Sequence, residues 1–334
     1  MKVLLYFEGE KAISKSGIGR AFKHQKAALK SAGVSYTLDP NDDYDILHIN
    51  TIGPNSASLI RKARKAGRKV IYHAHSTEED FKNSFVLSNQ LAPAFKKRLL
   101  HLYEKADRII TPTPYSKQLL EGYGLTQPIY AISNGIDLKR FDHNVDKINQ
   151  FKEYFHIQPN DKVVISVGLF FERKGILDFV EVAKAMPQYK FIWFGHVPLY
   201  SIPKNIRQIV TKDHPDNVIF PGYISGNVIE GAFCGANAFF FPSKEETEGI
   251  VVLEALASYQ NVILRDIPVY DPWLVDKENC YKGNNVEEFC SLVENVVEQK
   301  LPSLVEAGRQ SAIARSIPEI GKQLKAVYEE VLKG

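Results

Sequence analysis

Two glutamates, Glu246 and Glu254, lie eight residues apart in a segment that changes from a strand pattern to a helix pattern. Glu246 follows three phenylalanines at 239–241, a short apolar run typical of a buried strand, and Glu254 lies in the helical pattern that begins at Ile250. The turn between them is therefore predicted at the carboxyl end of a strand, where open parallel sheets bind ligands. Free N–H groups at the helix start around Gly249 and Ile250 suit a phosphate or sugar oxygen. The two carboxylates suit the hydroxyl groups of a sugar and a ribose.

Two cations follow another predicted strand. The apolar run 163–167 ends at Gly168, and Arg173 and Lys174 come shortly after it. A bound anionic group such as a phosphate needs positive charge, which cations and helix-start amides supply. We expect Arg173 and Lys174 to do so. The alternative is that both are solvated cations on a loop.

The elements that would position these residues form a regular pattern. Short apolar strands alternate with helical segments along the whole chain, which predicts doubly wound parallel sheets of the α/β class. The expected strands are 3–7, 45–49, 70–73, 108–111 and 129–132 in the first half, and 163–167, 190–194, 218–220, 238–241 and 262–265 in the second. The first strand of neither half is followed by G-x-G-x-x-G, which disfavours a nicotinamide or flavin enzyme. With 334 residues we expect two domains, a boundary near 142–160 and a site in the cleft between them.

The segment around Glu246 and Glu254 resembles the E-x7-E motif of the retaining glycosyltransferases of family 4. Other signatures of that family have counterparts in the same order along the chain: 132–137 with Phe141, 163–168 with Arg173–Gly175, and the last helix at 316–331. This resemblance implies the GT-B fold, with two Rossmann-like domains facing a cleft and a last helix that crosses back. The expected divisions are 1–150 for the acceptor- or membrane-facing domain, 151–315 for the nucleotide-sugar domain and 316–334 for the returning helix.

The resemblance also implies a chemistry. It predicts a UDP-sugar donor, retention of configuration by front-face transfer, no cofactor and no metal, with Glu246 orienting the sugar ring. In the family an arginine commonly follows the strand-end glycine directly, whereas this chain has Leu169 there. We therefore expect Arg173 to take over that contact with the phosphates.

Further site residues follow from the same resemblance. Gly17 and Gly19 lie between the first strand and the first helix, where the family has a glycine loop near the diphosphate, although a tight turn alone would explain them. His75 matches a histidine that contacts the reacting sugar or acceptor, and the three acids that follow it indicate a polar patch. The alternative is a structural histidine at a strand end. His196 matches a loop that approaches the donor, with a surface turn as the alternative.

Charge and composition indicate the surroundings of the protein. The net charge is +3, but residues 1–140 carry 22 Lys/Arg against 13 Asp/Glu, so the first half is basic. We expect contacts with an anionic membrane surface from Arg61, Lys62, Arg64, Lys65, Lys96, Lys97 and Arg98, with an ordinary solvated face as the alternative. The cations lack interleaved aromatic residues, so nucleic-acid binding is not expected. No run reaches the length of a membrane span, and the three cysteines form no metal or disulfide pattern, which predicts a cytoplasmic protein at the inner face of the membrane.

The amino-terminal half most resembles bacterial synthases that extend glucosyl-diacylglycerol. The matching segments are 4–9, 15–21, 48–50, 73–85 and 265–268. This resemblance implies glucosyl-diacylglycerol as acceptor and a dihexosyl-diacylglycerol, an anchor for lipoteichoic acid, as product. The donor sugar, galactose or glucose, stays open. The alternatives are a transferase of the same fold acting on a soluble saccharide, or a non-catalytic sensor of nucleotide sugars.

Overall fold

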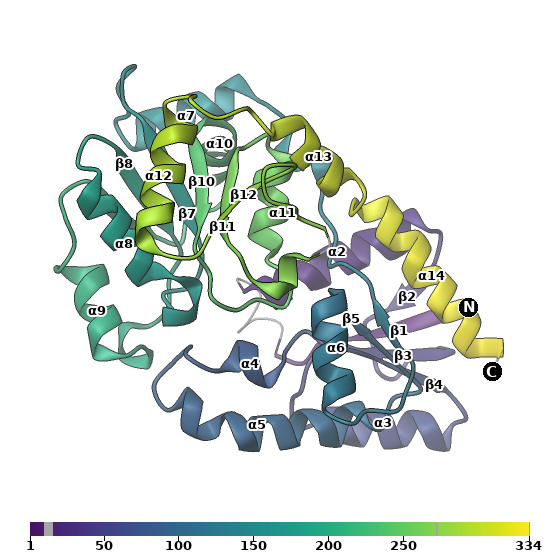
Figure 1. Cartoon of the computed structure of the whole chain (residues 1–334). Helices are drawn as coiled ribbons and strands as arrows, with labels where there is room; N and C mark the ends of the chain where they lie inside the picture. The colour runs from purple at the N-terminus through teal and green to yellow at the C-terminus, as the bar shows by residue number, and fades with distance from the viewer. Residues whose placement is uncertain (10–15, 272, 334) are drawn as a thin grey trace. The chain divides into compact units, whose positions relative to one another are not determined.

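The computed structural model of the chain describes residues 1–9, 16–271 and 273–333 (Figure 1). It divides into two compact units. Unit 1 comprises Met1–Phe81, Gln90–Asp137 and Arg315–Gly334, and unit 2 comprises Lys82–Asn89 and Leu138–Ala314. Both units are parallel sheets combined with helices, which confirms the predicted fold class.

The sheet of unit 1 has the strand order β2-β1-β3-β4-β5-β6, and every neighbouring pair is parallel. Its strands are β1 (Lys2–Tyr6), β2 (Ser35–Thr37), β3 (Ile46–Ile49), β4 (Lys69–His73), β5 (Arg108–Thr111) and β6 (Ile129–Ala131). Its helices are α2 (Gly17–Ser31), α3 (Ser56–Lys65), α4 (Glu78–Phe81), α6 (Pro114–Gly122), α14 (Ile317–Lys333) and nearly all of α5 (Ser88–Tyr103). The central strand β3 is buried along its whole length, as expected for a sheet covered on both faces.

The last helix of the chain belongs to unit 1. Helix α14 packs against α2, and the contact is close because Gly321 has no side chain. A Cβ at Gly321 would lie 2.4 Å from the carbonyl oxygen of Ala28. The apolar side chains of α14, among them Ile320 and Leu324, complete a core with Leu5 and Phe22.

The sheet of unit 2 has the order β12-β11-β10-β7-β8-β9 and is also parallel throughout. Its strands are β7 (Val163–Val167), β8 (Lys190–Phe194), β9 (Val218–Gly222), β10 (Ala238–Phe241), β11 (Val262–Arg265) and β12 (Tyr281–Gly283). Its α-helices are α7 (Val145–Tyr154), α8 (Ile176–Ala185), α9 (Lys204–Thr211), α10 (Asn227–Gly235), α11 (Ile250–Ala257), α12 (Val286–Val297) and α13 (Val305–Ile313). Four 3-10 turns join them: η1 (Leu138–Phe141), η2 (Glu172–Lys174), η3 (Leu199–Ser201) and η4 (Pro268–Tyr270).

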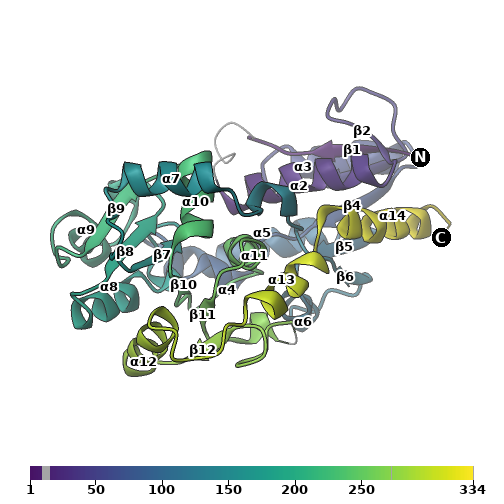
Figure 2. The ribbon, with the colours of Figure 1, turned by 90° about the horizontal axis from the view of Figure 1, so that it is seen from above.

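The division between the units falls at Asp137/Leu138, ahead of the 142–160 boundary and the 1–150 domain expected from the sequence. The reason is that α7 lies along α10, as Figures 1 and 2 both show. A Cβ at Gly231 of α10 would lie 1.9 Å from the carbonyl oxygen of Lys147, so only glycine permits this approach. The segment 142–160, where the sequence predicted a boundary, therefore contains a packed helix.

All ten expected strands are present, and two more appear among the described residues. The additional strands, β2 and β12, are three residues long and lie at sheet edges. Three residues are too few to show a periodic pattern, so these strands depend on pairing with a neighbour.

Candidate active site

A buried ion pair joins two of the predicted residues at the end of β10. The Nζ atom of Lys174 lies 2.5 Å from Oε1 of Glu246, and the Ser243 hydroxyl donates to the same oxygen at 2.7 Å. The two charged side chains are only 14% and 6% exposed. At such burial, one charge must compensate the other. Glu246 is thus held as a fixed carboxylate beside a cation.

The geometry of the chain brings this pair together. Gly175 ends η2 with φ +77°, and a Cβ there would lie 2.2 Å from the carbonyl oxygen of Pro242. The turn that carries Lys174 can therefore approach the end of β10 only because residue 175 is glycine. The two halves of the pair are 72 residues apart in the chain.

Glu254 lies in α11 and is 1% exposed, and Glu246 is 5% exposed. Neither glutamate therefore lies on a solvated helix face. A carboxylate buried in this way is costly unless polar groups contact it. Both acids are held inside unit 2.

The helix start between the two glutamates has an unusual backbone. Gly249 precedes α11 with φ +84° and no side chain caps the helix. Tyr270 of η4 lies behind it, with its hydroxyl 3.5 Å from the position of a Cβ at Gly249. Tyr270 is fully buried, and its hydroxyl has no hydrogen-bond partner among the described residues. Burial, and after it the negative charge of Glu246, raises the pKa of Tyr270 well above its usual value.

Arg173 is engaged within unit 2. Its Nε donates to the Ser84 hydroxyl at 2.8 Å, and a terminal nitrogen donates to the carbonyl oxygen of Glu245 at 3.1 Å. Its own carbonyl accepts the N–H of Lys244 at 2.6 Å. The structure therefore places Arg173, expected as a phosphate ligand, where it positions the loop that carries Glu246.

The ends of β7 and β8 meet at two glycines. The N–H of Gly168 donates to the carbonyl of Phe194 at 2.9 Å, and the indole of Trp193 donates to the carbonyl of Gly168 at 2.8 Å. Gly195 has φ +151°, and a Cβ there would lie 1.9 Å from the oxygen of Gly168. A Cβ at Gly168 would contact Cγ of Lys174 at 3.7 Å, so this strand end adjoins the ion pair. His196 follows in an exposed loop.

His75 lies in unit 1 at a cavity of about 190 Å³ beyond the ends of β3 and β4. Its Nε2 is 3.0 Å from Oδ1 of Asn50, which also lines the cavity, as do Glu8 and His73. Burial lowers the pKa of His75 to about 3, so the ring is neutral. A neutral imidazole beside an amide suits hydrogen bonding to a hydroxyl group.

Three buried histidines stack beneath this cavity. The rings of His48 and His73 have centroids 5.3 Å apart, and those of His73 and His75 lie 4.1 Å apart. Burial, then the neighbouring His75, lowers the pKa of His48 to about 3, and the pKa of His73 is also lowered by burial. The Nδ1 atom of His48 is 2.7 Å from the hydroxyl of Tyr328.

The expected glycine loop is the first turn of a helix. Helix α2 begins at Gly17, and the Ser16 side chain caps it by accepting the N–H of Gly19 at 3.3 Å. Gly17 is exposed, whereas Gly19 is buried. Residues 10–15, including Lys15 of the matching segment 15–21, lie outside the described residues.

Some of the basic residues predicted to contact a membrane are held by partners within the protein, and others are exposed. Lys96 pairs with Glu78 at 3.2 Å, and Arg98 donates to the carbonyl of Gly53 at 2.7 Å. Arg64 lies 3.6 Å from Asp107. Four of these cations are exposed and form no ion pair with the described residues: Arg61, Lys62, Lys65 and Lys97.

Sequence reasoning missed three residues of these sites: Ser243, Tyr270 and Asn50. Asn50 directly follows the predicted strand 45–49, and Ser243 comes two residues after the predicted strand 238–241. Their position at strand ends could have identified both. Nothing in the sequence marks Tyr270. In the part of the chain that is described, no group of three or more potential ligands could hold a metal ion, and no helix is long and apolar enough to cross a membrane.

Comparisons with known proteins identify the family. Residues 18–140 match the model of Glycosyltransferase Family 4, and residues 147–313 match that of Glycosyl transferases group 1. The chain is 50% identical, over its full length and 99% of the relative, to a processive diacylglycerol alpha-glucosyltransferase of Acholeplasma laidlawii. It is 23% identical to an alpha-galactosylglucosyldiacylglycerol synthase of Streptococcus pneumoniae, covering 86% of this chain and 74% of that one.

Solved structures share the fold. Sucrose-phosphate synthase from Thermosynechococcus elongatus superimposes with a TM-score of 0.81 at 19% identity, covering 100% of this chain and 99% of that chain. HepE of Anabaena, solved with UDP and glucose, superimposes with a TM-score of 0.79 at 16% identity, covering 99% and 100%. The chain therefore belongs to the family 4 glycosyltransferases of the GT-B fold.

Proposed function

We propose that this protein transfers glucose from UDP-glucose to the sugar of glucosyl-diacylglycerol and so makes a dihexosyl-diacylglycerol. The full-length relative at 50% identity is named as an alpha-glucosyltransferase of diacylglycerol, which favours glucose over galactose. Two further relatives are named as synthases of glucosylated diacylglycerols. The relative at 50% identity is named as processive and as acting on diacylglycerol, so diacylglycerol itself is a second acceptor to be tested.

The buried Lys174–Glu246 pair beside the start of α11 is the observation that supports this chemistry most directly. In the proposed complex, Glu246 accepts hydrogen bonds from hydroxyls of the donor sugar. Lys174 and the N–H groups at the start of α11 stabilise the diphosphate. Glu254 accepts a hydrogen bond from the ribose.

The proposed transfer retains the configuration of the sugar. The bond between the anomeric carbon and the phosphate oxygen breaks, and UDP leaves with the electron pair. The acceptor hydroxyl attacks from the same face, and its proton passes to the departing phosphate oxygen. The charge that develops on UDP is stabilised by fixed groups of the protein, which is the usual source of electrostatic catalysis.

We further propose that transfer is independent of a metal ion and takes place at the inner face of the cell membrane. Lys174 supplies positive charge for the diphosphate, and the exposed cations of α3 supply attraction to anionic lipids. Activity that is unchanged by EDTA is the expected result. A loss restored by Mg²⁺ or Mn²⁺ would contradict the metal-independent proposal.

The test is mass spectrometry of lipid products from the purified protein. UDP-glucose and UDP-galactose are supplied in turn with vesicles that contain diacylglycerol, glucosyl-diacylglycerol or neither, and Glu246→Ala is the control. The expected result is a dihexosyl lipid from UDP-glucose that the variant does not make. Donor hydrolysis without a lipid product would move the acceptor to a soluble saccharide, and no turnover at all would favour a sensor of nucleotide sugars.

A further inference from the structure

Four large apolar side chains gather on the surface of unit 2. Val86 and Leu87 come from the segment before α5, and Leu199 and Tyr200 come from η3. They are 47%, 59%, 38% and 82% exposed, respectively. We call these four residues the apolar tip.

A hydrogen bond holds the two halves of the apolar tip together. The N–H of Val86 donates to the carbonyl of Ser201 at 2.9 Å. Ile202, directly after η3, is 1% exposed and anchors this side in the core of unit 2. The exposed side chains therefore stand on fixed backbone, although 115 residues separate Val86 from Ser201.

The first half of the apolar tip is also fixed to the candidate donor site. Arg173 donates through its main chain to the carbonyl of Asn83 at 3.2 Å and through Nε to the hydroxyl of Ser84 at 2.8 Å. Leu87 has φ +66°, a conformation that is uncommon for a residue other than glycine. Leu87 is thus kept exposed in a backbone conformation that residues with a side chain seldom adopt.

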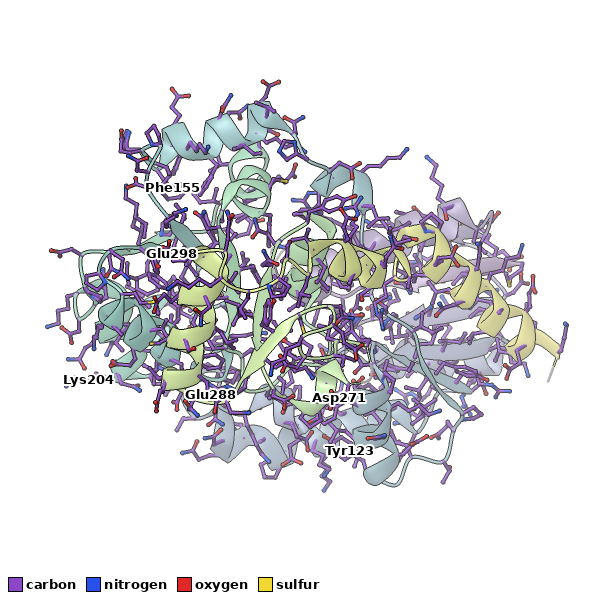
Figure 3. The ribbon with its side chains drawn as sticks, turned by 45° about the horizontal axis from the view of Figure 1, so that its top comes forward. Tyr123, Phe155, Lys204, Asp271, Glu288 and Glu298 are labelled. Carbon is purple, nitrogen blue, oxygen red and sulfur yellow. The ribbon has the colours of Figure 1, made fainter. Side chains whose placement is uncertain are left out.

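The two segments that carry the apolar tip have charges of only one sign in the sequence. The segments 81–103 and 195–212 contain none of the 39 Asp and Glu residues of the chain. They contain seven Lys and Arg residues: Lys82, Lys96, Lys97, Arg98, Lys204, Arg207 and Lys212. Lys204 and Arg207 are exposed on α9, while Ile206 of the same helix is buried, and Figure 3 shows Lys204 at the outer edge of this unit.

This combination fits a lipid surface better than a protein partner. A stable protein interface covers about 800 Å² and 20–30 residues on each side, far more than four side chains supply. An anionic bilayer needs only a few apolar side chains at the acyl boundary, an aromatic residue at the headgroups and nearby cations. Each Lys or Arg near such a surface contributes on the order of 1 kcal/mol.

We propose that the apolar tip is a membrane-docking surface. Val86, Leu87 and Leu199 enter the acyl boundary, Tyr200 lies at the headgroups, and Lys204 and Arg207 bind anionic lipid headgroups. The inference rests on the proposed lipid acceptor, which must be reached in a bilayer. Because Arg173 ties the tip to the loop that carries Glu246, docking also holds the donor site of unit 2 near the lipid.

The experiment measures binding to sedimented vesicles of phosphatidylglycerol and phosphatidylcholine. The variant Leu87→Ser/Tyr200→Ser is compared with the wild type and with Val145→Ser/Tyr154→Ser. The control removes two apolar side chains of α7 that are 59% and 54% exposed, in a helix that also carries acids. We expect the tip variant to bind at least about tenfold more weakly and the control to bind like the wild type.

A second readout keeps folding separate from docking. Transfer to a short-chain, water-soluble glucosyl-diacylglycerol should be equal in the tip variant and the wild type. If the double variant does not fold, Tyr200→Ser alone provides the test, because a side chain that is 82% exposed contributes little to the core.

The outcomes separate this inference from the proposed function. Equal vesicle binding by the tip variant and the wild type overturns the docking surface, even where lipid products form. An equal loss in the α7 control overturns it as well. Weaker binding of the tip variant alone supports the surface, even where the wild type makes no dihexosyl lipid and the proposed acceptor fails.

Discussion

The oxygen Oε1 of Glu246 has both a cation and a hydroxyl as partners, Lys174 and Ser243. This arrangement fixes the direction of the carboxylate at a place where both side chains of the ion pair are buried. A fixed charge of this kind orients hydroxyl groups without losing energy to reorganisation. The role of Glu246 is therefore expected to depend on its charge as well as its shape.

Glu246→Gln keeps the shape of the side chain and removes its charge. We expect kcat/KM for the donor to fall by about 10²–10³-fold, the range seen when one fixed polar group of a transition-state site is removed. The matched control is Glu298→Gln, whose carboxylate accepts from the Tyr189 hydroxyl at 2.7 Å on another part of unit 2. Steady-state kinetics with UDP-glucose checks both variants. A Glu246→Gln protein with more than half of the wild-type activity would contradict this role.

At the scale of elements, the site depends on how closely strand ends approach one another. Gly195 shows this most clearly, because its neighbour is the backbone oxygen of Gly168, which cannot move aside as a side chain would. Gly175 makes the corresponding contact with Pro242. Gly175 directly follows Lys174, and Gly195 contacts Gly168, which adjoins the same lysine.

Gly195→Ala should therefore lower the stability of the fold by more than backbone strain alone, because the new Cβ also meets the oxygen of Gly168. Gly222→Ala is the control, since Gly222 also has positive φ, +82°, but a Cβ there would meet nothing within 4 Å. We expect about 1 kcal/mol of destabilisation for Gly222→Ala and clearly more for Gly195→Ala, with weaker UDP binding only in the latter. Urea denaturation and calorimetric titration with UDP measure the two effects. Equal stability of the two variants would show that the strand ends separate without cost.

The histidine stack at the ends of β3 and β4 makes stability depend on pH. Folded His48 and His75 have a pKa of about 3, below the value of about 6.5 for an unfolded histidine. The unfolded chain therefore binds more protons than the folded protein. The contribution of the two histidines to the free energy of unfolding is complete above pH 6.5 and is lost as the pH falls from 6.5 toward 3. Each such histidine contributes at most about 1.4 kcal/mol per pH unit to the slope of the free energy of unfolding against pH.

Urea denaturation between pH 7.5 and 5 should show this fall in the free energy of unfolding. His48→Gln should reduce the slope by the contribution of one proton, whatever its effect on absolute stability. The control is the exposed His101→Gln, which removes a histidine outside the stack. A slope that is the same in all three proteins would mean that His48 binds protons equally in the folded and unfolded chains.

At the scale of the whole molecule, charge is distributed unevenly along the chain. The basic excess lies in residues 1–140, and α3 contributes three cations that are exposed without a recorded ion pair: Arg61, Lys62 and Lys65. Long-range attraction to an anionic surface depends on such cations and is screened by salt.

Replacing Arg61, Lys62 and Lys65 by Ser should weaken binding to anionic vesicles at low salt, with the difference shrinking as salt is added. The control replaces Lys184, Lys300 and Lys322, which are exposed and paired with neighbouring glutamates. Both variants lose the same charge, so only the position of the cations differs. Equal binding by the two variants in sedimentation assays would exclude a specific role for α3.

Much of the fold could be predicted because its signals are local. Strands such as β7 and β10 are short and mostly apolar runs. The positions of helices could be inferred from the periodic spacing of their apolar residues. The segment of Glu246 and Glu254 was also recognisable, because both residues lie in one strand-turn-helix unit. The boundary of the units was misplaced because the packing of α7 against α10 depends on glycines in a distant helix.

The sequence by itself determined the α/β class, the order of the strands along the chain, the positions of the acid pair and the excess of positive charge in the first half. Only the tertiary structure decided that Lys174 meets Glu246, that Arg173 turns to Ser84, and that Val86 lies beside Ser201. The physical reason is the range of the interactions. Periodicity and turn residues act over a few positions, whereas these contacts join residues that are 72, 89 and 115 positions apart and form only when the whole core packs.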